Sequence, residues 1–139
     1  LFKGGPAHGA PPQNVCLAPD DYLLDHLGGG FDLLYFTDGS AVPPALSEVA
    51  RVVRGRGVGL RIVAISSQAQ PQPVQGADLT LSDSQGRCRE RHGVPADPPS
   101  GAAYLLRPDQ HVCARWLALD ARRLQSALDN ATCTQGAQA

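Results

Sequence analysis

The stretch that most constrains the fold runs from Gly101 to Trp116, where two apolar runs flank a short polar turn. The first run is Ala102–Leu106, the second is His111–Trp116, and residues 107–110 between them read RPDQ. Proline is favoured at the second position of a type I turn, and aspartate tolerates the backbone conformation of the third. The pattern therefore predicts a β-hairpin near the end of a domain.

Two further apolar runs predict buried strands that a helix connects. The runs Phe31–Phe36 and Leu60–Ile65 are short, apolar and rich in aromatic or β-branched residues. Between them, Pro43 and Pro44 suit the first turn of a helix, and apolar residues then recur at helical spacing. Because a helix connects the two strands, we expect them to be parallel. The apolar face of this helix consists of Leu46, Val49, Ala50 and Val53.

Shorter elements complete the chain. Asp20 is predicted to cap a helix that continues to Leu27, and the glycines at 28–30 end it. Asp120 is predicted to cap a final helix, in which one face is apolar. That face consists of Ala121, Leu124 and Leu128. We also expect short strands at 15–17 and 79–81 and a short helix at 87–92.

These elements follow the order β-α-β, a loop and then β-β-α, which is the order of the thioredoxin core. We therefore expect an α/β chain with a thioredoxin-like fold, in which a central mixed β-sheet is flanked by helices in a single domain. Residues 1–14 are rich in glycine, proline and alanine. This composition predicts an extended linker stub, followed by the thioredoxin-like domain at residues 15–139.

Composition excludes several classes of function. The 139 residues carry a net charge of −1, so we expect no general attraction to nucleic acid or to anionic membranes. No apolar run approaches the roughly 20 residues that span a bilayer. The chain contains no methionine, and we therefore expect it to be a fragment of a longer product. The excess of arginine over lysine indicates a GC-rich, bacterial coding sequence.

Neither the cysteines nor the histidines show the spacing of a metal site. Cys16, Cys88, Cys113 and Cys133 form no CxxC pair, and no two of them lie at the spacing of a metal clip. We expect mostly buried free thiols in a reducing cytoplasm, with a disulfide pair as the alternative. The four histidines form no HxxH or HExxH pair, so we predict no metal site and expect exposed or singly bonded rings.

The hairpin sequence AYLLRPDQHVCARW closely resembles a segment of the C-terminal domains of FAD-dependent aromatic hydroxylases, the group of phenol hydroxylase and 3-(3-hydroxyphenyl)propionate hydroxylase. The resemblance covers about residues 10–130, with support from Gly28–Gly39 and Ser82–Val94. The second of these segments is also similar to peroxiredoxin-like members of the thioredoxin superfamily. The resemblance implies a thioredoxin-like tail that carries no catalytic residue and binds no cofactor itself.

The same resemblance describes a parent enzyme. It implies a flavoprotein monooxygenase that uses NAD(P)H to reduce FAD and then hydroxylates a phenolic compound. The residues for that chemistry would lie in upstream FAD and substrate domains of the same chain. The tail would then be structural: it would pack on those domains or contribute a homodimer contact.

The redox site of a thioredoxin is missing from the sequence. That site needs a cysteine at the start of the first core helix, where the helix dipole lowers the pKa of the thiol. Residues 37–44 read TDGSAVPP there, and the cis-proline that usually faces the site is replaced around residues 100–101. We expect Ser40 or Thr37 to cap this helix rather than to bind an anion. Two alternatives remain: a freestanding redox domain that uses a displaced Cys88 or Cys113, and an interaction module of an unrelated protein.

The remaining polar clusters predict scaffold or contact residues. The glycines at 28–30 precede a strand, which is the reverse of a dinucleotide-binding loop, so no FAD fingerprint is present. The basic cluster of Arg87, Arg89, Arg91 and His92 is expected to form a solvated helix face, with an anion or partner contact as the alternative. The only tryptophan suits core or interdomain packing. The candidate interdomain or subunit contacts are Arg107, Asp109, His111, Arg115 and Trp116.

Overall fold

The computed structural model describes residues 4–7, 9–10, 14–19, 21–70, 72–94 and 101–136. In the part of the chain that the structure describes, a five-stranded sheet and a two-stranded sheet combine with three α-helices and a short 3-10 helix. In chain order, the elements are β1 (Cys16–Ala18), β2 (Asp21–Tyr22), the 3-10 helix η1 (Leu23–His26), β3 (Phe31–Thr37), α1 (Pro44–Gly55), β4 (Leu60–Ser66), β5 (Leu79–Ser82), α2 (Arg87–Arg91), β6 (Ala103–Leu106), β7 (Val112–Trp116) and α3 (Ala121–Gly136).

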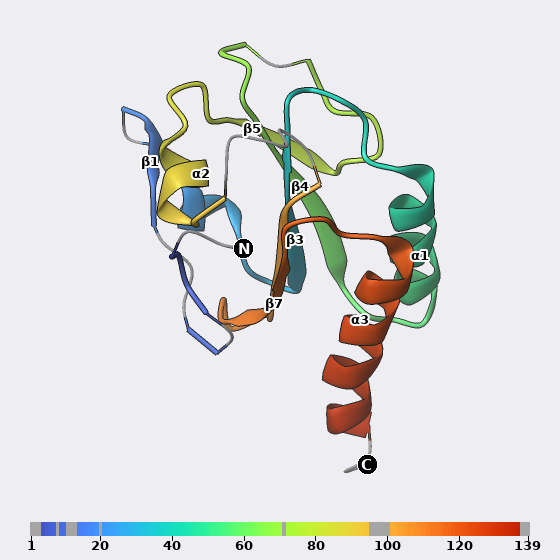
Figure 1. Cartoon of the computed structure of the whole chain (residues 1–139). Coiled ribbons are helices and arrows are strands. Elements are labelled where there is room, and N and C mark those ends of the chain that lie inside the picture. The colour runs from blue at the N-terminus through green and yellow to red at the C-terminus, as the bar shows by residue number, and fades with distance from the viewer. Residues whose placement is uncertain are drawn as a thin grey trace.

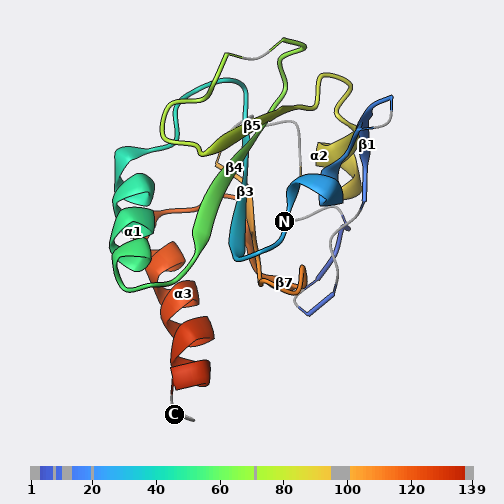
Figure 2. The ribbon, with the colours of Figure 1, turned by 180° about the vertical axis from the view of Figure 1, so that it is seen from behind.

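Five strands form one mixed sheet in the order β5-β4-β3-β6-β7. The strands β3 and β4 are parallel, as expected for strands that a helix connects. Strand β5 is parallel to β4, and β6 and β7 add an antiparallel hairpin. Figures 1 and 2 show α1 and α3 on one side of this sheet and α2 with β1 on the other. The sheet therefore separates two hydrophobic cores.

Strand β3 lies at the centre, and all seven of its residues are buried. Its side chains alternate between the two cores, because successive residues of a strand point to opposite faces. Leu33 and Tyr35 face the core below α1 and α3, while Leu34 and Phe36 face the core below α2. A strand that is covered on both faces consists of a continuous run of apolar residues. This pattern explains why β3 could be predicted from the sequence.

The predicted hairpin is confirmed. Strands β6 and β7 pair antiparallel, and the N–H of Gln110 donates to the carbonyl of Arg107 at 2.8 Å to close the turn. Gln110 itself has a φ of 64°, so it takes the left-handed conformation that often follows a type I turn in a hairpin. Its side-chain amide donates to the carbonyl of Leu27 at 3.1 Å and so fixes the turn against η1.

The predicted helix over residues 20–27 is wrong in type. Residues 21–22 form β2, which pairs with β1, and only Leu23–His26 are helical, as a 3-10 turn. Because residues 21–22 pair with β1, only residues 23–27 are left before the glycines, which is little more than one helical turn. The N–H of Leu24 instead finds a side-chain acceptor in Asn14 Oδ1, at 3.1 Å. Asp20, the predicted cap, lies outside the described residues.

The final helix begins as predicted. The Oδ1 atom of Asp120 accepts a hydrogen bond from the N–H of Arg123 at 2.8 Å, which is the geometry of an N-cap. Leu124 and Leu128 are fully buried in the core that α3 shares with α1. The described part of the predicted linker contacts the domain, at Gly9 and Ala10 among others. The boundary at residue 15 stays a prediction.

One buried charge lies within the sheet. Asp32 of β3 is 1% exposed, and its registered neighbour on β4 is Arg61. Arg61 Nε donates to Asp32 Oδ1 at 3.0 Å, and the N–H of Gly28 donates to Oδ2 at 2.8 Å. Arg61 Nη2 also donates to the carbonyl of His26 at 2.6 Å. The bridge thus joins the starts of two parallel strands to the turn that precedes β3.

We predict that Asp32→Ala lowers the free energy of unfolding by about 2 kcal/mol, because it removes a charged acceptor of two hydrogen bonds and leaves the Gly28 N–H without its partner, while the half-exposed Arg61 can turn to solvent. Urea unfolding measures this change. Glu48→Ala is the matched control, since Glu48 forms an exposed ion pair with Arg51, and such pairs contribute little. Equal effects of the two substitutions would contradict the assigned role of Asp32.

Candidate functional site

The start of α1, where a thioredoxin would carry its cysteine, is a closed loop. Thr37 Oγ1 donates to the carbonyl of Ser40 at 2.8 Å and accepts from the N–H of Gly39 at 3.2 Å. Asp38 Oδ1 accepts from the N–H and the hydroxyl of Ser40, at 3.0 and 2.6 Å. Val42 then points into the core and is 3% exposed. The loop therefore presents no nucleophile at this position.

The prediction that Ser40 or Thr37 caps this helix is wrong. Both side chains bond within residues 37–40, and α1 begins without a side-chain cap, after Pro43. The residue at the N-cap position is Pro43, whose side chain has no oxygen that could accept a hydrogen bond from the first turn. The predicted replacement of the cis-proline falls partly outside the described residues, which resume at Gly101.

The two candidate redox cysteines are not activated. Cys88 lies in the first turn of α2 and is fully buried, and burial, followed by the negative charge of Asp83, raises the pKa of its thiol. Cys113 lies in β7, and partial burial raises its pKa as well. Cys16, Cys88 and Cys113 are free thiols. Since the thiolate is the nucleophile, both shifts work against redox chemistry at neutral pH.

A polar network lies beneath α2. His92 Nδ1 donates to the carbonyl of Cys88 at 2.8 Å, and Tyr104 of β6 donates its hydroxyl proton to the carbonyl of His92. Arg115 Nη1 donates to the Tyr104 oxygen at 3.3 Å. The rings of His92 and Tyr104 pack edge to face, with centroids 5.1 Å apart. His92 and Tyr104 are buried and Arg115 is half-buried, and the bonds among them fix the C-terminal end of α2 to the sheet.

The capping of α2 explains part of the sequence around residues 82–94. The two carboxylate oxygens of Asp83 accept from the N–H groups of Cys88 and Arg89, each at 2.9 Å. Arg89 lies over the ring of Phe36, 5.8 Å from its centroid, and burial lowers the pKa of its guanidinium. The prediction of a solvated basic face is therefore wrong for Arg89 and also for His92, which is 0% exposed.

The five predicted contact residues do not form one surface. Arg107, Asp109 and His111 lie together in the hairpin turn, where Arg107 and His111 each pair with the carboxylate of Asp109. Arg115 and Trp116 are neighbours in β7, so their side chains point to opposite faces of the sheet. Arg115 reaches Tyr104 on the α2 face, whereas Trp116 packs on the α1 and α3 core.

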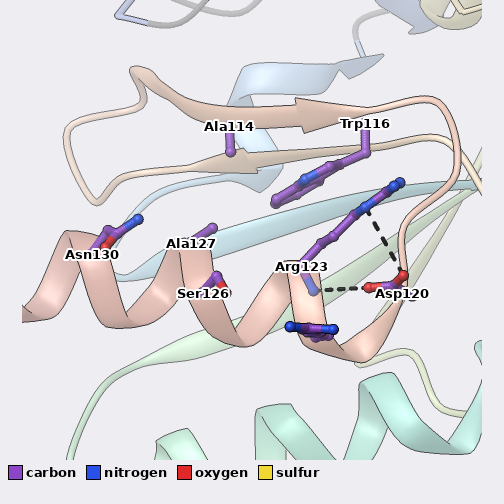
Figure 3. Close-up of a pocket in the computed structure, with 8 residues that line it drawn as sticks. Ala114, Trp116, Asp120, Arg123, Ser126, Ala127 and Asn130 are labelled. Atoms are coloured by element: carbon purple, nitrogen blue, oxygen red, sulfur yellow. Dashed lines mark hydrogen bonds and ion pairs between the residues drawn. The ribbon is translucent and has the colours of Figure 1, made fainter.

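Trp116 lines the groove shown in Figure 3. The indole projects from β7 toward α3, where Arg123 and Asp120 pair at the start of the helix (Figure 3). The groove has a volume of about 530 Å³. Its lining combines the apolar side chains of Ala114, Trp116 and Ala127 with polar ones, and no described residue bonds the exposed guanidinium of Arg122. The groove is lined by Ala114, Trp116, Asp120, Arg122, Arg123, Ser126, Ala127 and Asn130.

Among these lining residues, the sequence analysis assigned a contact role only to Trp116. The signal that could have found Arg122, Ser126 and Asn130 is their spacing, since polar residues that recur every four positions share a helix face. Within the described residues, no group of three or more histidine, cysteine, aspartate or glutamate side chains could hold a metal ion. No helix in that part of the chain is long and apolar enough to cross a membrane.

Comparison with solved structures confirms the thioredoxin-like α/β fold. The chain is similar to the mitochondrial 2-Cys peroxiredoxin of Plasmodium falciparum, with a TM-score of 0.65 and 10% identity over 96% of this chain and 98% of that chain. The Plasmodium vivax 2-Cys peroxiredoxin is also similar, with a TM-score of 0.59 and 18% identity over 84% of this chain and 72% of that chain.

Two flavin-containing proteins are similar over part of their length. The rebeccamycin biosynthetic enzyme RebC, solved with reduced flavin, has a TM-score of 0.55 and 25% identity over 87% of this chain and 18% of that chain. Aklavinone-11 hydroxylase, solved with FAD and aklavinone, has a TM-score of 0.53 and 23% identity over 78% of this chain and 17% of that chain. The chain thus spans less than a fifth of either protein. No protein-family profile and no curated protein matches the chain.

We predict that stability falls with acidification through His92. Burial lowers the pKa of His92 in the folded chain, whereas an unfolded histidine has a pKa of about 6.5. Below that pH, the unfolded chain takes up a proton first, so stability decreases until the pKa of the folded state is passed. Urea unfolding at several pH values between 7.5 and 5 measures the slope.

The matched variant is His92→Asn, whose amide can donate to the Cys88 carbonyl but does not titrate. We expect a shallower slope for this variant than for the wild type. Identical slopes would contradict the assignment.

Proposed function

We propose that this chain is the non-catalytic, structural C-terminal domain of an FAD-dependent aromatic-ring monooxygenase whose substrate is a phenolic compound. The observation that carries the proposal is the start of α1, where a thioredoxin-like core holds a closed, cysteine-free loop with Val42 packed inside. The partial likeness to RebC and to aklavinone-11 hydroxylase supports a place within a larger flavoprotein.

In this proposal the cofactors belong to other parts of the parent protein. FAD and NAD(P)H would be bound by upstream domains of the same polypeptide, in a cytoplasmic enzyme. This chain would contribute a rigid body that packs on those domains or on a second subunit. Its own polar networks would keep the strands and α2 in place.

The groove between β7 and α3 is the surface best suited to that contact. An indole and a guanidinium are the side chains that most often dominate interface energies, and here Trp116 and Arg122 lie on the same groove. Arg107, Asp109 and His111 in the hairpin turn form a second, more polar candidate. Arg115 is better assigned to the internal network, because it bonds Tyr104 and Gly4.

We predict that the isolated chain binds no FAD, whereas the product of the complete coding sequence purifies with FAD. The amino-acid sequence encoded upstream of Leu1 should contain a GxGxxG loop that opens a βαβ unit. Flavin fluorescence and the single tryptophan report binding by the isolated chain. Stoichiometric FAD binding by residues 1–139 alone would contradict the proposal.

The contact itself is tested by Arg122→Ala in the complete protein. We expect this variant to release FAD on the order of tenfold faster, because an interface hot spot contributes about 1.4 kcal/mol or more. Arg56→Ala is the matched control, since Arg56 is equally exposed but lies at the end of α1, away from the groove. An unchanged rate of FAD release in Arg122→Ala would contradict the assignment of this groove as the contact surface.

A further inference from the structure

The charged side chains that line the groove between β7 and α3 do not balance. Two guanidinium groups, those of Arg122 and Arg123, line it together with a single carboxylate, that of Asp120. Asp120 is engaged at the start of α3, where its Oδ1 atom accepts from the N–H of Arg123 at 2.8 Å and its Oδ2 atom lies 4.0 Å from Arg123 Nε. The groove therefore has one positive charge in excess, and this charge belongs to Arg122.

The next carboxylate along α3 does not compensate Arg122. Asp129 lies two turns further along the helix, about 10 Å away along its axis, and it does not line the groove. Its Oδ1 atom accepts from Gln125 Nε2 at 2.8 Å. Within the described part of the chain, no group forms a hydrogen bond or an ion pair with Arg122, so its guanidinium is exposed to water.

The indole of Trp116 adds a second hydrogen-bond donor that lacks a protein partner. It projects from β7 into the groove (Figure 3), and no described residue accepts from its Nε1–H. Ser47 Oγ is the one buried side-chain nitrogen or oxygen without a partner among the described residues, so Trp116 Nε1 is in contact with solvent. A surface that covers the indole needs an acceptor for this N–H.

The middle of the groove is lined by small side chains. Ala114 of β7 and Ala127 of α3 contribute only methyl groups, and both also pack against the core below α1 and α3. An apolar side chain from outside can therefore enter between the indole and the helix and bury these methyl groups. The groove thus presents apolar surface beside an unpaired cation.

Covering such a surface imposes a chemical condition on its partner. A partner that displaced the water without replacing its hydrogen bonds would leave a charge and a donor unpaired in a buried place, which is strongly unfavourable. A backbone carbonyl can accept from a guanidinium but does not neutralise it. A carboxylate does both, and its two oxygens match the two parallel N–H groups of arginine.

We propose that the segment that covers this groove presents a carboxylate side chain to Arg122, next to an apolar side chain that lies on Trp116. The segment belongs to the part of the polypeptide upstream of Leu1. This inference rests on the proposed function, which places an upstream domain on the groove, and it adds the chemistry by which that domain is recognised.

Arg122→Lys in the complete protein tests the carboxylate directly. A carbodiimide couples a carboxyl group to an amine in direct contact with it: the amide bond forms, and the carbodiimide leaves as its urea. The substitution therefore places a coupling group where the guanidinium was. Lys3 is the only other lysine of residues 1–139, so mass spectrometry can assign the linked peptides without ambiguity.

We expect an amide link between position 122 and an aspartate or glutamate upstream of Leu1. Arg56→Lys is the matched control, because Arg56 is exposed at the end of α1 and does not line the groove, and we expect no link from it to the same acid. The proposal would be overturned by a link to Asp120 or Asp129 alone, by no link, or by equal yields from both variants.

Hydroxyl-radical labelling of Trp116 separates this proposal from the proposed function. We expect less labelling in the complete protein than in residues 1–139 alone, because the upstream domain covers the indole. Equal labelling would overturn both proposals. A protected Trp116 without the amide link would overturn the carboxylate and leave the contact itself in place.

Charge reversal provides a second variant. Arg122→Glu sets two carboxylates against each other, which opposes the contact, whereas Arg122→Lys keeps the charge. We expect Trp116 labelling in Arg122→Glu to rise to the level of residues 1–139 alone, and labelling in Arg122→Lys to stay at the wild-type level. Equal labelling in these two variants would overturn the proposal.

Discussion

The structure depends on the position of β3 between β4 and β6, with a charged residue inside it. Every residue from Phe31 to Thr37 is buried, and one of them is Asp32. A lone carboxylate at such a site would cost several kcal/mol, so the strand is compatible with this position only because Arg61 and the Gly28 N–H satisfy both oxygens. The bridge also sets the register, since Asp32 and Arg61 are registered partners on parallel strands. A slip by one residue would break it.

The two faces of the sheet on either side of β3 differ in the kind of core that they form. The face below α1 and α3 is a purely apolar core, and its edge opens into the groove beside Trp116. The face below α2 combines apolar packing with the buried network of His92, Tyr104 and Arg115. In both, the groups that could carry out chemistry are used for structure. Cys88 is buried, His92 bonds its own helix, and the loop before α1 is closed on itself.

Much of the sheet could be predicted from the sequence, for physical reasons. The strands β3 and β4 are buried on both faces and so appear as apolar runs, and the turn of the hairpin carries Pro108 and Asp109 where a type I turn needs them. The helix over residues 20–27 could not be excluded, because its leucine spacing suits a helix and the competing pairing of β2 with β1 is a tertiary interaction. Of the candidate contact residues, Arg107, Asp109 and His111 do lie together, whereas Arg115 and Trp116 are neighbours in sequence whose side chains the alternation of β7 places on opposite faces. The contacts of Gly9 and Ala10 with Val112 could not be predicted, because they are made by backbone groups and leave no side-chain pattern in the sequence.

We propose that the thioredoxin-like core has a structural role in this protein and carries out no redox chemistry of its own. The most direct measurement is the rate at which the chain, in the presence of dithiothreitol, reduces insulin disulfides or consumes hydrogen peroxide. We expect a rate equal to that of dithiothreitol alone, and the same rate for Cys88→Ser and Cys113→Ser. A rate above that background, which either substitution abolishes, would contradict the claim and identify the chain as a redox domain with a displaced cysteine.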